Sequence, residues 1–99
     1  MRVIVLILVS LLLQSCASAI EGRQLAEGKK YFRDGDYKTA FHQLLPLASE
    51  GNAKAQYAVG YMYYYGYGVA QDPESGRFWM QKSADHKYPP AEKALEMLK

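Results

Sequence analysis

The chain has 99 residues with a single cysteine, and its 12 basic and 10 acidic residues leave a net charge of +2. A chain this short forms one small domain, and its nearly balanced charge excludes the basic footprint of a nucleic-acid-binding protein. The lone cysteine excludes an internal disulfide and a zinc site built on cysteines.

The first element has the pattern of an export signal. Arg2 provides a positive start, Val3–Leu13 is apolar apart from Ser10, and polarity returns at Gln14. The apolar run is shorter than the roughly twenty residues that span a bilayer. The pattern therefore predicts a secretory signal peptide over residues 1–15.

Two cleavage patterns overlap at the end of this signal. The first, Leu-Gln-Ser-Cys, resembles a bacterial lipobox in which Cys16 becomes the lipidated first residue of the mature chain. The second is a small-x-small pattern ending at Ala19, which would release a soluble periplasmic or secreted protein. We favour the lipobox because the lone cysteine directly follows the apolar run. The lipobox predicts a lipid anchor on the mature chain and a tether over residues 16–22. The alanine after the cysteine resembles the signal that sorts lipoproteins of Gram-negative bacteria to the outer membrane, so we expect the anchor there, with the protein facing the periplasm.

Residues 23–99 are predicted to be a helical repeat. A shift of 36 residues pairs Asp36 with Asp72 and Ala48 with Ala84. Residues that favour helix starts and glycines that favour helix ends alternate along this part of the chain. They predict helices over about 23–33, 37–49, 53–65, 73–86 and 89–98. The predicted fold is an all-α α/α-solenoid of antiparallel helical hairpins, about two and a half repeats, preceded by the signal peptide.

The second unit of this pattern resembles the Sel1-like repeat, a relative of the tetratricopeptide repeat. The matching positions are Ala55, Val59, Gly60, Tyr63, Gly66, Gly68, Asp72, Trp79 and Ala84. Residues 27–56, with Gly28 and Ala40 among the matches, resemble a shorter opening repeat. The resemblance implies a solenoid that serves as a protein-interaction scaffold. Two positions depart from the family pattern: Gly76 replaces a small alanine, at a cost of about 1 kcal/mol in helix propensity, and Lys87 replaces a glycine.

Tyrosines on the helix predicted over 53–65 form a candidate binding row. At 100° per residue from Val59, the rings of Tyr57, Tyr61 and Tyr64 fall at roughly 140 to 200°, away from the core stripe. In the family that the chain resembles, such helices line the concave surface. We predict a peptide or glycan groove with these tyrosines as its floor, and with edges at Lys29 and Phe32. The alternative is that the tyrosines only pack hairpin on hairpin.

Catalytic and metal-binding patterns are absent from the sequence. His42 and His86 are single residues on different predicted helices, with no ligand-spaced acid beside them, and no nucleophile elbow or paired carboxylates occur. We therefore predict a monomeric, non-enzymatic module that needs no metal or cofactor. It is expected to bind a protein or peptide partner and to attach to the membrane through a lipid on Cys16. The alternatives are a binder of small molecules or cell-wall fragments with weak hydrolase activity, and a purely structural repeat fragment.

Overall fold

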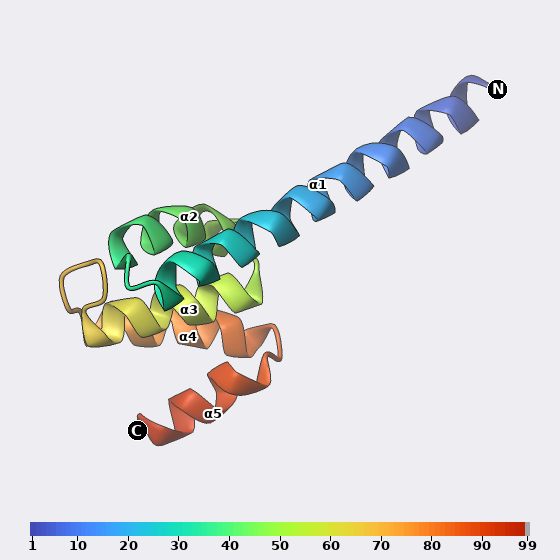
Figure 1. The fold of residues 1–99 in the computed structure, drawn as a ribbon. Helices are drawn as coiled ribbons and strands as arrows, with labels where there is room; N and C mark the ends of the chain where they lie inside the picture. The colour runs from blue at the N-terminus through green and yellow to red at the C-terminus, as the bar shows by residue number, and fades with distance from the viewer. Residues whose placement is uncertain (99) are drawn as a thin grey trace.

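The structure is a computed structural model that describes residues 1–98, without the side chains of residues 15–18. It consists of five helices, and no strand occurs among the described residues. The helices are α1 (Arg2–Arg33), α2 (Tyr37–Ser49), α3 (Ala53–Tyr65), α4 (Pro73–Asp85) and α5 (Pro89–Met97). Neighbouring helices pack pairwise as hairpins, and the amino-terminal part of α1 projects from the body (Figure 1). The all-helical prediction is confirmed, with an arrangement consistent with a helical repeat solenoid.

The predicted start of the first helix is wrong. The helix begins at Arg2 instead of near residue 23, so the segment 16–22, predicted as a tether, is helical. The physical reason is that residues 2–33 contain no proline, and Gly22 and Gly28 are insufficient to end a helix that continues on both sides. Cys16 lies in this helix, but its side chain is outside the described residues.

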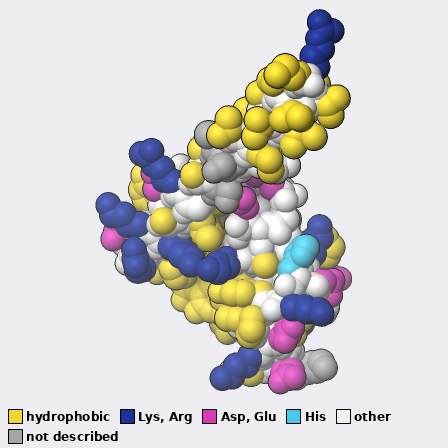
Figure 2. All heavy atoms as spheres, turned by 90° about the vertical axis from the view of Figure 1, so that its right-hand side faces the viewer, with side chains coloured by type: hydrophobic (Ala, Val, Ile, Leu, Met, Phe, Trp, Pro, Cys, Tyr) yellow, Lys and Arg dark blue, Asp and Glu magenta, His cyan; other side chains and the backbone are white. Residues whose placement is uncertain are grey.

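The projecting half of α1 is strongly apolar. Its most apolar 18-residue window has a mean hydropathy of 2.5 and is not buried at all, so α1 is long and apolar enough to cross a membrane. A signal sequence near an amino terminus has the same properties. Figure 2 shows the hydrophobic side chains gathered on this projection, with a basic residue at its tip. The signal peptide over residues 1–15 thus stays a prediction.

The other helix boundaries agree with the sequence signals to within about one residue. Asp36, Asn52 and Asp72 each accept a hydrogen bond from the backbone N–H three residues later, at 3.3, 3.0 and 3.2 Å. These bonds satisfy amide groups that have no partner within the helix. The Ser75 hydroxyl also donates to Asp72, at 2.6 Å, and the two Ser75 hydrogen bonds lower the pKa of the Asp72 carboxyl.

The main core lies between α1, α2 and α3. Its fully buried members are Ala40, Leu44, Leu47, Ala48, Ala55, Val59 and Met62. Tyr63 and Trp79 are half-buried and pack against this cluster, as their places in the repeat pattern predict. Gly28 on α1 faces Leu44 closely, because a Cβ at Gly28 would lie 2.6 Å from the Leu44 Cδ2 atom. The first hairpin therefore packs at this point through a small residue on α1 and a large residue on α2.

The departures at Gly76 and Lys87 both have structural explanations. A Cβ at Gly76 would lie 2.8 Å from the Gly60 carbonyl oxygen, so the two glycines let α3 and α4 approach each other closely. Ala84 is half-buried next to the end of α4, and its carbonyl accepts from the Lys87 N–H at 2.8 Å. Lys87 has a φ of 58°, so it adopts the left-handed conformation that a glycine usually provides.

Candidate functional site

A concave groove lies between α1, α3 and the start of α5. It has a volume of about 380 Å³, which is within the usual range for ligand pockets. Three lining residues come from α1, one from α2 and four from α3, and Tyr88 precedes α5. We call this feature the aromatic groove; its lining residues are Lys29, Phe32, Arg33, Leu44, Lys54, Tyr57, Ala58, Tyr61 and Tyr88.

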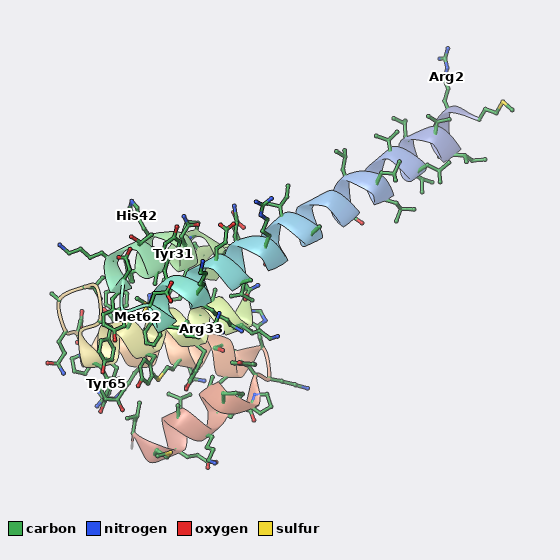
Figure 3. The ribbon with its side chains drawn as sticks, viewed as in Figure 1. Arg2, Tyr31, Arg33, His42, Met62 and Tyr65 are labelled. Atoms are coloured by element: carbon green, nitrogen blue, oxygen red, sulfur yellow. The ribbon has the colours of Figure 1, made fainter. Side chains whose placement is uncertain are left out.

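The helix periodicity explains why these residues share one groove. On α1 the lining residues are at positions i, i+3 and i+4, starting at Lys29, and on α3 they are at i, i+3, i+4 and i+7, starting at Lys54. Residues at these spacings lie on one face of a helix. Figure 3 shows Arg33 at the carboxyl-terminal end of α1, where this helix lies next to α3.

The aromatic rings of the groove contact one another. The Tyr57 ring lies 5.8 Å from the Tyr88 ring and 6.5 Å from the Tyr61 ring, and Tyr61 lies 6.1 Å from Phe32. Tyr67, from the loop after α3, stacks on Tyr61 with an interplanar angle of 9°. These contacts favour the ring orientations that the groove presents, since edge-to-face and offset pairs are the favoured aromatic geometries.

The environment of Tyr61 raises the pKa of its hydroxyl. Burial raises the pKa of Tyr61 above its ordinary value of 10.0, and the neighbouring tyrosines, with Tyr67 first among them, raise it further. The half-buried Tyr61 side chain therefore offers a hydroxyl that can donate a hydrogen bond to a ligand next to an apolar surface.

The structure brings together four of the five residues predicted for the concave face. Lys29, Phe32, Tyr57 and Tyr61 line the groove, whereas Tyr64 lies outside it. Its ring faces α4, where the Arg77 guanidinium carbon lies 5.8 Å from the ring centroid. Tyr64 also contacts Tyr65, with the ring centroids 5.0 Å apart, so its place is at the packing surface of the second hairpin.

Sequence reasoning missed five residues that line the groove. Arg33, Lys54 and Ala58 could have been found, because they continue the helical spacing of Lys29 and Tyr57. Leu44 and Tyr88 could not, since they reach the groove through the packing of separate helices. Among the described residues, no group of three or more His, Cys, Asp or Glu could hold a metal ion.

Comparison with known proteins supports the repeat assignment for one part of the chain. Residues 53–88 match the Sel1 repeat family, whose repeats generally mediate protein–protein interaction. The chain is also 51% identical over 49 residues to chitin synthase regulatory factor 3 of Schizosaccharomyces pombe. That match covers 50% of this chain and only 5% of the yeast protein, so it says nothing of the rest of either protein. No solved structure matches the chain.

Proposed function

We propose that this protein is a non-enzymatic interaction module of the cell envelope that holds a segment of a protein partner in the aromatic groove. The observation that carries the proposal is the groove itself, where Phe32, Tyr57 and Tyr61 form an open aromatic surface beside the hairpin core. Tyrosine buries a large area with little loss of side-chain entropy and keeps a hydroxyl for hydrogen bonding. Aromatic residues are also enriched among the side chains that dominate binding energy.

The match to the Sel1 repeat supports the same function, because that family binds protein partners. The yeast relative is a regulatory factor by name, which is consistent with a module that acts on another protein. The described residues of the groove include no histidine, cysteine or carboxylate that could act as a nucleophile or general base. We therefore propose that the groove binds its partner without turnover, and separately that a monomer is the binding unit.

A small-molecule or cell-wall-fragment binder is the second candidate function. It is favoured by the groove volume of about 380 Å³, which could hold a compact ligand, and by the ring faces of Tyr57 and Tyr61, which could stack on a sugar. Weak hydrolysis in this alternative would require a polar catalytic residue near the groove.

Photo-cross-linking in the cells that make the protein tests the leading proposal. A benzoylphenylalanine at position 57 should form a discrete adduct with one partner protein, and Tyr61→Ala should weaken that adduct about 30-fold, as for a binding hot spot. The matched control is position 78, because Phe78 is an aromatic residue with 56% exposure that does not line the groove. Equal adducts from both positions, or none from position 57, would contradict the proposal.

We further propose that the protein is exported and held in the outer membrane by a lipid on Cys16, with the groove facing the periplasm. The lipobox-like sequence before Cys16 and the apolar run of α1 support this location. Intact mass of the protein from its own cells should show an acylated amino-terminal Cys16, and Cys16→Ser should remove the acyl mass. A mature chain that starts at Ile20 would establish cleavage at Ala19 instead.

A further inference from the structure

The charged residues that line the aromatic groove all have the same sign. Lys29 and Arg33 come from α1 and Lys54 comes from α3, so both helices that border the groove contribute a cation. No aspartate or glutamate is among the lining residues. The whole chain carries 12 basic and 10 acidic residues, so the composition alone would place acids and bases in the groove in similar numbers.

These cations are available for an external ligand. All three side chains are exposed, and the ion pair found among the described residues joins Arg23 to Glu27, outside the groove. Glu21, the carboxylate of α1 that reaches α3, accepts a hydrogen bond from the Asn52 side chain at 3.0 Å. Figure 2 shows basic side chains beside a hydrophobic surface on the body of the protein, below the projecting helix.

We propose that the groove recognises an acidic peptide segment with one large apolar side chain. The inference rests on the proposed function and adds the chemistry of the partner. The apolar side chain would lie on Phe32, Tyr57 and Tyr61, and carboxylates on either side of it would pair with the cations. Arg33 can form a bidentate pair with a carboxylate, and the apolar floor lowers the local dielectric, which strengthens charge pairing at the rim.

A peptide fits this arrangement because the cations and the rings line the same groove. The lining residues of α3 extend over two helical turns, from Lys54 to Tyr61, a length of about 10 Å at 1.5 Å per residue. Three or four residues of an extended chain span that distance. The segment therefore needs its carboxylates within about two residues of the apolar side chain.

Selection from a random twelve-residue peptide library tests the inference on the full chain, purified in an uncharged detergent. Peptides that bind the native protein should be enriched in Asp and Glu next to an aromatic or large aliphatic residue. The variant Lys29→Glu/Lys54→Glu should bind the selected peptides at least about tenfold more weakly, since two attractive rim charges become repulsive. Binding of the same peptides to the native protein should also fall about tenfold between 50 and 500 mM salt.

The matched control is Lys38→Glu/Lys93→Glu, which makes the same change in net charge at two exposed positions outside the groove. It should bind the selected peptides like the native protein, and circular dichroism should show the same helix content for both variants. Enrichment of neutral or basic peptides, or equal losses in the two double variants, would overturn the acidic specificity and leave the groove as a peptide site. Failure to select any peptide would count against the proposed function as well.

Discussion

Replacing Gly68 with alanine should destabilise the protein by about 3 kcal/mol or more, and lower its melting temperature by more than about 10 °C. Gly68 has a φ of +75°, and this left-handed conformation costs an alanine about 1–2 kcal/mol. The new Cβ would also lie 2.4 Å from the carbonyl oxygen of Tyr37 and 2.6 Å from its carbonyl carbon. Backbone atoms at the start of α2 cannot rotate away, so the whole loop must shift. Thermal unfolding followed by circular dichroism measures the effect.

The control for this prediction is Gly35→Ala. Gly35 also has a positive φ, +84°, but a Cβ there would meet nothing within 4 Å. Its substitution should cost only this conformational term of about 1–2 kcal/mol. Equal losses for the two variants would show that the loop after α3 does not press against α2. The loop also carries Tyr67, which stacks on Tyr61, so a shifted loop should alter the groove as well.

Local sequence signals were sufficient to predict most helix ends. Asp36, Asn52 and Asp72 accept hydrogen bonds from the first turn of their helices, and these contacts depend only on residues three positions apart. The start of α1 could not be found in this way. The apolar run predicts an export signal separate from the first helix, whereas the sequence has no proline that would end a helix between that run and residue 33.

The candidate groove could be predicted only in part. A helical wheel shows in which direction each side chain points from its own helix, but it does not show which other helix lies in that direction. The wheel correctly separates Val59 and Met62, which are fully buried, from the tyrosine row. It places Tyr64 and Tyr57 only about 20° apart, yet Tyr57 lines the groove and Tyr64 contacts α4. Tyr64 differs from Tyr57 because α4 lies close to α3 on the side of Tyr64.

The physical cause of that close approach is the pairing of Gly60 on α3 with Gly76 on α4. A Cβ at Gly60 would lie 2.8 Å from the Gly76 carbonyl oxygen and 3.0 Å from the Met80 backbone nitrogen. A Cβ at Gly76 would lie 2.8 Å from the Tyr64 Cβ and 2.9 Å from its backbone nitrogen. The loss of helix propensity at Gly76 is therefore offset by contacts that a larger residue would prevent.

Gly60→Ala should consequently destabilise the protein by about 2 kcal/mol, although alanine is the better helix former. Overpacking against backbone atoms costs about 1–3 kcal/mol or more, and the gain of about 1 kcal/mol in helix propensity offsets only part of it. Gly76→Ala should have a similar effect. Denaturant unfolding of both single variants and the double variant measures the two costs and their coupling.

The double variant should lose less than the sum of the single losses. Once α4 has moved away from α3 to admit the first methyl group, the second meets less crowding, so the two substitutions are not independent. Gly22→Ala is the control, because Gly22 is helical and a Cβ there would contact nothing within 4 Å. It should leave stability equal or slightly higher. If Gly60→Ala behaved in the same way, α3 and α4 would be farther apart than the structure places them.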